Sequence, residues 1–126
     1  MRLNMDCVRD LLLLFEEKTE PHSCLSYSPQ EISAELPDYS TKEILYHVSQ
    51  CAATDMFRGY QEDCSGNFLL SDLSPKAHEF LANTREEGVW NKTKKVAKDV
   101  GSTSLNALCQ IASGVVSAII QSKLGL

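Results

Sequence analysis

The pattern that most constrains the fold is a hairpin signal placed after three helix signals. Two short segments with aromatic or aliphatic residues, 57–60 and 68–70, flank the polar, glycine-containing segment 61–67. Such a pattern predicts two antiparallel strands joined by a loop. Helical patterns precede and follow this hairpin, so the sequence predicts a mainly helical α+β fold with one small hairpin.

Helix-start signals divide the first part of the chain. In residues 5–18, apolar side chains recur at helical spacing, which predicts an amphipathic helix; they are Met5, Val8, Leu11, Leu12 and Phe15. Residues 25–27 are expected to form only an extended connector. Ser28 and Glu31 make a capping box with Pro29 at the first helical position, which predicts a short helix through Leu36.

Four more helices are predicted. The third spans residues 40–55, with Ser40 or Thr41 as its N-cap, and the fourth starts at Pro75 after the cap Ser74 and ends near Gly88. A fifth helix is expected over residues 89–100 and a sixth over residues 105–123. Three residues are candidate N-caps for the sixth helix: Ser102, Thr103 and Ser104.

The order of these elements is typical of a winged helix-turn-helix domain. We predict that domain for residues 1–86, with a C-terminal helical extension over residues 87–126. A plain small α+β domain is the alternative. The extension carries an apolar stripe that predicts either a homodimer or docking back on the domain; its residues are Leu105, Leu108, Ala112, Val115 and Ile119.

Composition points to a cytoplasmic protein outside the membrane. The chain has 126 residues, a net charge of -5 and five cysteines without a CxxC pair, a pattern expected of reduced thiols. The start of the chain is too charged for a signal peptide. The most apolar tract, residues 105–120, is shorter than the ~20 residues that span a bilayer, so no membrane span is expected.

Five stretches of sequence together resemble a known family. They are MDCVRDLLL at residues 5–13, SPQEI at 28–32, KEILYHVSQC at 42–51, LSPKAHEFL at 73–81 and WNKTKK at 90–95. As a set they are similar to an uncharacterised family of short bacterial and phage or prophage proteins, a domain of unknown function of winged-helix type. The resemblance implies the fold and a mobile-element setting, and it brings no catalytic residue. LSPKAHEFL also resembles the segment after the wing in winged-helix regulators, although Ala77 replaces their usual glycine.

In a winged helix that reads DNA, the second helix of the turn motif enters the major groove. The exposed side chains of the third helix are expected to be Thr41, Lys42, Glu43, Tyr46, His47, Ser49 and Gln50. The predicted contacts to duplex DNA are Thr41, Lys42, Tyr46, Ser49, Gln50 and the wing residue Arg58. A solvated helix face is the alternative interpretation. Glu62 and Asp63 oppose Arg58 and weaken the wing as a phosphate clamp.

Charge favours a second hypothesis. Residues 1–74 have a net charge of -8, whereas residues 75–126 have a net charge of +3. The basic patch, Lys92, Lys94, Lys95 and Lys98, thus lies outside the turn motif. Because DNA affinity depends on neutralising phosphates, an acidic reading head argues against strong DNA binding. The alternative function is an acidic protein-interaction module or inhibitor that contacts a host or phage protein.

Enzymatic chemistry finds no motif. The sequence contains no Gly-rich phosphate loop, HExxH or GxSxG pattern. His22, His47, His78 and the five cysteines lack the spacing of metal ligands. We therefore expect a non-enzymatic protein with no catalytic residue, no metal and no cofactor.

Overall fold

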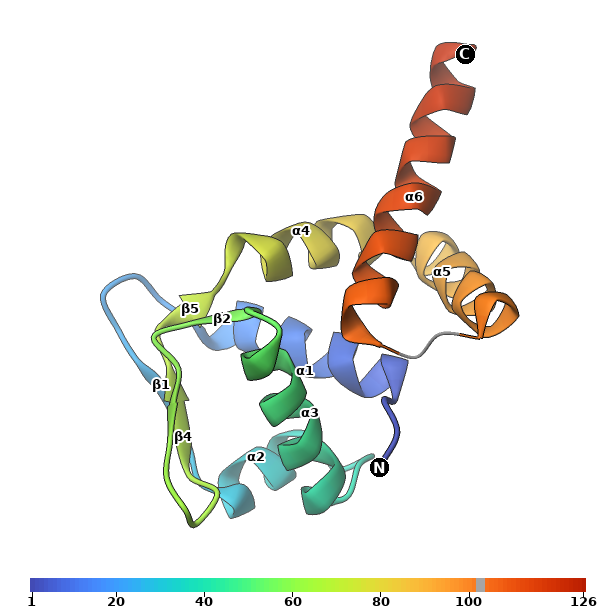
Figure 1. Ribbon diagram of the computed structural model, residues 1–126. Coiled ribbons are helices and arrows are strands. Elements are labelled where there is room, and N and C mark those ends of the chain that lie inside the picture. The colour runs from blue at the N-terminus through green and yellow to red at the C-terminus, as the bar shows by residue number, and fades with distance from the viewer. Residues whose placement is uncertain (102–103) are drawn as a thin grey trace. The chain divides into compact units, whose positions relative to one another are not determined.

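The computed structural model describes residues 1–101 and 104–126. The described residues form two compact units, Met1–His78 and Glu79–Leu126. Mixed α+β structure, mainly helical, is observed (Figure 1), which confirms the predicted fold class at that level. The predicted domain boundary after residue 86 stays a prediction.

The first unit contains three complete helices and five short strands among the residues described. In chain order they are α1 (Met5–Lys18), β1 (Leu25–Tyr27), α2 (Pro29–Glu35), α3 (Thr41–Ala53), β2 (Phe57–Arg58), β3 (Gln61–Glu62), β4 (Phe68–Leu70) and β5 (Asp72–Leu73). Helix α4 (Pro75–Thr84) starts in this unit and ends in the second one. The second unit continues with α5 (Glu87–Val100) and α6 (Leu105–Leu124).

Helix starts follow the predicted caps closely. The Ser28 hydroxyl and the Glu31 carboxylate form the full capping box of α2. Ser40 caps α3, and the Ser74 hydroxyl accepts the Ala77 N–H at 3.3 Å at the start of α4. Ser104 is the N-cap of α6. The other two cap candidates for α6, Ser102 and Thr103, lie outside the described residues.

The break between α4 and α5 comes earlier than predicted. α4 ends at Thr84 rather than near Gly88, and α5 begins at Glu87 rather than Val89. The Glu86 carboxylate accepts the Gly88 N–H at 3.1 Å and acts as the N-cap of α5. A capping carboxylate satisfies an otherwise unpaired N–H of the first turn, which explains why the new helix starts before the glycine.

The hairpin is longer than predicted and gains a third strand. β4 pairs antiparallel with β3 and with β1, so the sheet order is β1-β4-β3. β2 and β5 pair antiparallel as a second ribbon beside it. Two predictions were wrong here. Leu25–Tyr27 is a paired strand, not a connector, and Gln61–Glu62 belongs to a strand rather than to the loop. Both segments become strands because each forms backbone hydrogen bonds with β4.

Aromatic rings fill the core of the first unit. Phe15 of α1 is fully buried, and its ring centroid lies 5.9 Å from that of Tyr27, 5.6 Å from Phe57 and 6.0 Å from Phe68. These three partners come from β1, β2 and β4. The ring of Phe15 therefore packs α1 against the sheet, and burial of this apolar surface stabilises the unit.

In the second unit, α5 and α6 pack side by side. Trp90 of α5 is buried, with Phe80 in an edge contact and the Lys94 ammonium 5.5 Å from the centre of its ring. Gly101 ends α5 with a φ of 79°, a left-handed conformation that glycine adopts readily. Because α6 is longer than α5, its last turns have no neighbour in this unit (Figure 1).

Candidate interaction surfaces

The outer face of α3 contains part of the predicted DNA-binding set. Lys42 and Ser49 are exposed, and Tyr46 is half-buried. Their spacing of four and three residues places them on one stripe of the helix. Gln50 is also half-buried. Thr41 is directed elsewhere, because its hydroxyl donates to the Ser33 hydroxyl of α2 at 2.9 Å.

His47 was expected on this exposed face, and that prediction was wrong. Its side chain is fully buried, and its Nε2 accepts the Asn4 backbone N–H at 2.7 Å. Nδ1 lies 2.7 Å from the Glu43 carbonyl oxygen. Since Nε2 is the acceptor, Nδ1 carries the proton and donates it to that carbonyl. The imidazole fastens the start of α1 to α3, so it is not available to a partner.

Glu43 shares this role at the start of α1. Its carboxylate accepts the Asn4 side-chain amide at 3.3 Å. The Asn4 side chain in turn caps α1 by accepting the Cys7 N–H at 3.3 Å. Glu43 is therefore half-buried and belongs to the scaffold of the unit rather than to the reading face predicted for α3.

The tip of the β3–β4 loop lies beside α2 and α3. A Cβ placed on Gly66 would lie 3.0 Å from Pro29 Cγ and 3.4 Å from Leu45 Cδ1. The Asp63 carboxylate organises this tip by accepting the Ser65 N–H at 2.9 Å and the Asn67 side-chain amide at 2.9 Å. These hydrogen bonds lower the pKa of Asp63, so the tip keeps a fixed negative charge.

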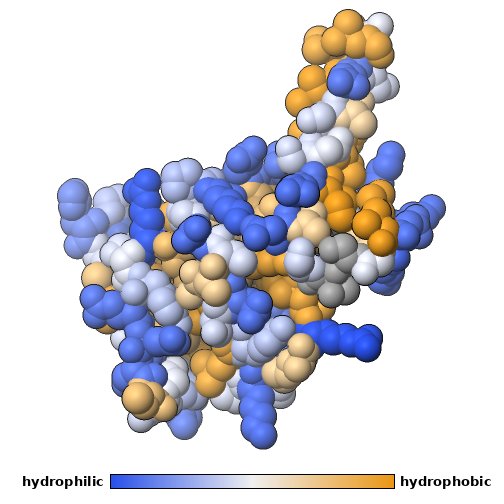
Figure 2. Space-filling model, viewed as in Figure 1, coloured by the Kyte–Doolittle hydropathy of each residue, from blue (hydrophilic) through white to orange (hydrophobic). Residues whose placement is uncertain are grey.

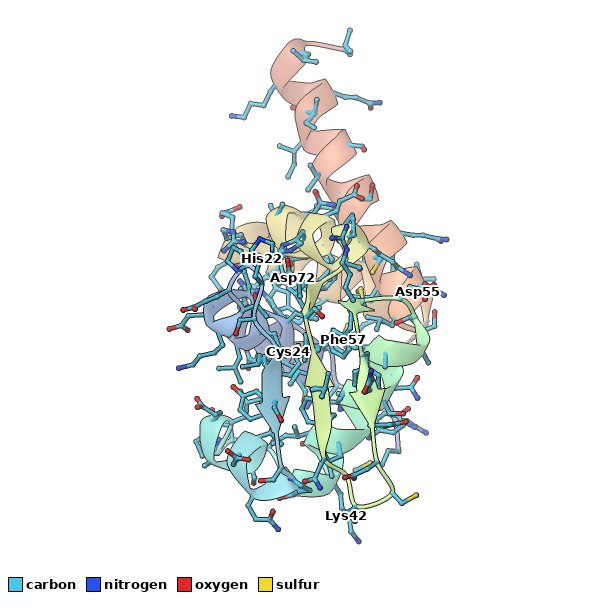
Figure 3. All side chains as sticks on the ribbon, turned by 90° about the vertical axis from the view of Figure 1, so that its left-hand side faces the viewer. His22, Cys24, Lys42, Asp55, Phe57 and Asp72 are labelled. Atoms are coloured by element: carbon cyan, nitrogen blue, oxygen red, sulfur yellow. The ribbon has the colours of Figure 1, made fainter. Side chains whose placement is uncertain are left out.

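Other carboxylates surround the same end of the unit. Glu31 and Glu35 of α2 add to burial, the main cause, in raising the pKa of Tyr27. The Tyr60 hydroxyl donates to the Glu62 carboxylate at 2.9 Å, and burial followed by this bond raises the pKa of Tyr60. We call the surface formed by Glu31, Glu35, Glu62 and Asp63 the acidic end. Lys42 also lies at this end of the unit (Figure 3).

Arg58 does not join Lys42. Arg58 pairs with Asp72 at the base of the hairpin, and Lys42 and Asp72 lie at opposite ends of the unit in Figure 3. The predicted DNA contacts therefore do not form one continuous patch. At the acidic end, Lys42 therefore lacks the help expected from Arg58.

Arg58 instead lines a pocket that the sequence did not indicate. The pocket lies between the α1–β1 loop and the base of the hairpin, and its other lining residues are Glu20, Pro21, His22, Ser23, Cys24, Ser71 and Asp72. His22 has a φ of 62°, uncommon for a residue with a side chain. Three segments far apart in sequence form this pocket, so no local spacing could reveal it.

Asp72 is held at the wall of that pocket. Its Oδ1 accepts the Leu73 N–H at 2.7 Å and the Thr19 hydroxyl at 3.4 Å, and it lies 3.5 Å from His78 Nε2. Figure 3 shows His22, Cys24 and Asp72 on this side of the unit. Among the described residues, no three His, Cys, Asp or Glu side chains are grouped so that they could bind a metal ion.

The cysteines differ in exposure. Cys7 is fully buried, and burial followed by the charges of Glu43 and Asp10 raises the pKa of its thiol to about 12. A thiol with so high a pKa is a poor nucleophile at neutral pH. Cys24 and Cys64 are exposed, Cys51 is buried and Cys109 is half-buried.

The predicted self-association stripe is mostly covered within the chain. Leu105, Leu108, Ala112 and Val115 are buried, whereas Ile119 is 37% exposed. The apolar surface that remains open follows them, at Ile120, Leu124 and Leu126. The helix that packs against α6 is α5 of the same unit, so the two outcomes expected for this stripe, a homodimer or docking back on the domain, stay predictions.

α6 also changes the argument about length. It has 20 residues, not the 16 of the apolar tract, and is long and apolar enough to cross a membrane by length and composition. Only 22% of an apolar 18-residue stretch within this helix is buried. The sequence-based objection that the segment is too short therefore does not apply to the observed helix.

Comparison with known proteins gives the family. An "Uncharacterized protein" of Haemophilus influenzae is 24% identical over 127 residues, which cover 95% of this chain and 99% of that protein. No solved structure matches. The model of the family described as "Hypothetical protein (DUF2513)" matches residues 2–104, which include all of the first unit except Met1, and also α4 and α5. The chain therefore belongs to the DUF2513 family, a family of uncharacterised domains of unknown function.

Proposed function

We propose that the chain is a non-enzymatic winged-helix protein whose acidic end binds a basic surface on another protein. The element order α1-β1-α2-α3 followed by a hairpin, together with the sheet order β1-β4-β3, supports the winged-helix interpretation. In that interpretation α3 is the reading helix and the loop of residues 63–67 is the tip of the wing.

The negative charge of the acidic end is the observation that favours a basic protein as the partner. The unit Met1–His78 contains six Lys and Arg against thirteen Asp and Glu, a net charge of -7. Its acidic end combines the fixed Asp63 carboxylate with Glu31, Glu35 and Glu62, and Lys42 is the nearby cation of α3. Phosphates of duplex DNA would be repelled there, whereas Lys and Arg side chains of a protein would be attracted.

The proposal is tested with a basic probe. A fluorescent oligolysine peptide should bind the full chain at low salt, and its affinity should fall at physiological salt because screening weakens the attraction. A Glu35→Lys, Glu62→Lys variant should lose most of this binding. A Glu16→Lys, Glu17→Lys variant on α1 has the same charge change away from the acidic end and is the matched control. Equal loss in both variants would refute a localised surface.

A second candidate, a regulator that binds duplex DNA as a dimer, is favoured by the position of α3. Lys42 and Ser49 are exposed on α3 and flank the half-buried Tyr46, on the helix with which a winged helix contacts base edges. Fluorescence anisotropy with a random-sequence duplex and with DNA from upstream of the chain's own coding sequence tests it. Binding that a Lys42→Ala, Gln50→Ala variant loses would support DNA reading in place of protein binding.

Three expectations stay predictions: the mobile-element setting, the cytoplasmic location and the homodimer. If a dimer forms through α6, the burial of Leu105, Leu108 and Val115 requires that Ile119, Ile120 and Leu124 make the contact. Light scattering on the purified chain would measure its mass and decide whether a dimer exists.

A further inference from the structure

The open end of α6 is the largest exposed apolar feature of the described chain. Of the six large hydrophobic residues that are exposed, five lie in the second unit: Val100, Ile119, Ile120, Leu124 and Leu126. Four of them follow the last buried residue of α6, Val115. Figure 2 shows these apolar atoms at the end of the helix. Folding within the unit thus covers the first half of α6 and leaves the second half open.

The composition of this half is unusual for a helix in water. Across the 20 residues of α6, Lys123 is the single charged residue, and the chain contains no Asp or Glu after Asp99. A solvated helix normally carries charged residues on its outer face. Here the outer positions are Ser, Gln, Gly and Ala, so no row of charges keeps the helix in water.

Helical spacing gathers the open apolar residues on one side. Ile120 and Leu124 follow the half-buried Val116 at intervals of four, and Ile119 lies three positions after Val116. Lys123 lies between Ile119 and Ile120 around the helix, in its last turn. A long lysine stem can keep its ammonium among lipid phosphates while apolar neighbours enter the acyl region.

A second copy of the chain fits this surface less well. A two-stranded coiled coil needs about three to four heptads, whereas the part of α6 after Val115, residues 116–124 up to the Gly125 cap, is shorter than two. Stable interfaces bury about 800 Å² on each partner, more than one face of so short a helix offers. A longer helix pair would require Leu105 and Leu108 to leave their buried positions.

We propose that the open half of α6 inserts into the surface of an anionic lipid bilayer. A bilayer needs to cover only one face of a single helix, and α6 has the length and composition of a membrane-seeking helix. The unit Glu79–Leu126 carries six Lys and Arg against four Asp and Glu, which favours anionic headgroups. This inference uses only the second unit and is independent of the acidic end, and it departs from the sequence-based expectation of a protein without membrane contact.

The experiment is co-sedimentation of the full chain with vesicles. Vesicles of phosphatidylcholine with phosphatidylserine should bind the chain, and vesicles of phosphatidylcholine alone should bind it more weakly. An Ile120→Ser, Leu124→Ser variant should lose binding by about tenfold or more, because two inserted aliphatic side chains are removed. Both residues are exposed, at 51% and 67%, so the fold should persist, which circular dichroism checks. Gln121→Ser, on the polar side of the same turn, is the matched control and should bind like the parent.

Three results would overturn the proposal. The first is a parent chain that sediments with neither kind of vesicle. The second is a double variant that binds as well as the parent. In the third, light scattering shows a dimer that Ile120→Ser, Leu124→Ser converts to a monomer while vesicles bind neither protein; a second copy then covers this surface.

Discussion

The two units differ in how much of their apolar surface they bury. In Met1–His78, Met1 is the single large hydrophobic residue among those that are exposed, and an aromatic cluster around Phe15 fills the core. In Glu79–Leu126, α6 buries its first half and exposes Ile120, Leu124 and Leu126. Charge differs as well, since the first unit is strongly acidic and the second is weakly basic.

The two units therefore offer different kinds of contact. The first unit has a charged surface with few exposed apolar side chains, which suits long-range electrostatic recognition. The second presents apolar side chains that water solvates poorly, which suits burial against lipid or protein. Each unit can also be followed by its own spectroscopic signal. All four tyrosines lie in the first unit, and the single tryptophan, Trp90, lies in the second.

The largest expected effect is in the core of the first unit. Phe15→Ala should lower the free energy of unfolding by about 3–5 kcal/mol, because it removes a buried ring and leaves a cavity among Tyr27, Phe57 and Phe68. Urea titration followed by the near-ultraviolet signal of tyrosine measures the change. Ile120→Ala in the open half of α6 is the control and should change stability by less than about 0.5 kcal/mol.

The same titration followed by Trp90 fluorescence sharpens the comparison. If Phe15→Ala shifts the tryptophan transition as far as the tyrosine transition, the units unfold as one, and the contrast between them is limited to their surfaces. A tyrosine transition that moves alone would show that each unit has a stability of its own.

A smaller loss is expected at the buried imidazole. His47→Ala should cost about 1–3 kcal/mol, because the Asn4 N–H and the Glu43 carbonyl each lose their partner in a buried place. Ser49→Ala, on the exposed face of α3, should stay within about 0.5 kcal/mol of the parent. The tyrosine signal in urea reports both variants. A loss no greater for His47→Ala than for Ser49→Ala would contradict the structural role assigned to His47.

Alanine substitutions at two glycines, one in each unit, should change stability in opposite directions. Gly59 has a φ of 62°, and a Cβ there would clash with Ser71 Oγ, so Gly59→Ala should destabilise the hairpin by about 1–2 kcal/mol or more. Gly114 of α6 has open space around it, so Gly114→Ala should stabilise the helix by about 0.5–1 kcal/mol. Thermal unfolding by circular dichroism compares them. Destabilisation by Gly114→Ala would mean that α6 makes a close contact through this residue.

The smallest effect concerns thiol chemistry. At mildly alkaline pH, iodoacetamide should modify the exposed Cys24 and Cys64 and spare Cys7, whose pKa burial raises to about 12. The raised pKa means that the folded state holds the Cys7 proton more tightly than the unfolded chain does. Its contribution to stability is therefore complete below pH 9, the ordinary value, and is lost as the pH rises toward 12. Mass spectrometry of the alkylated peptides tests this, and early labelling of Cys7 would contradict it.

Local signals predicted the helices because those signals act within a few residues. The capping box at Ser28 and Glu31, the Ser40 cap and the Ser74-Pro75 start all form as the sequence indicates. β1 was not predicted, since its three residues become a strand only by pairing with Leu70, Leu69 and Phe68. A contact between residues more than forty positions apart leaves no local pattern.

The candidate sites depended on tertiary structure to a greater degree. Spacing alone placed His47 on the outer face of α3, but the start of α1 covers it and supplies a hydrogen bond. The winged-helix interpretation also grouped Lys42 with Arg58, whereas the hairpin sets Arg58 beside Asp72 and the pocket. Side chains were assigned to a face without knowledge of which neighbouring element would cover it.

The sequence by itself determined the helical segments, their caps, the hairpin and the opposite charges of the two parts of the chain, because these follow from local backbone preferences and from composition. The tertiary structure alone decided which residues are available to a partner. Burial depends on contacts between distant segments, and those contacts hid His47 and half of the α6 stripe while leaving Ile120 and Leu124 open.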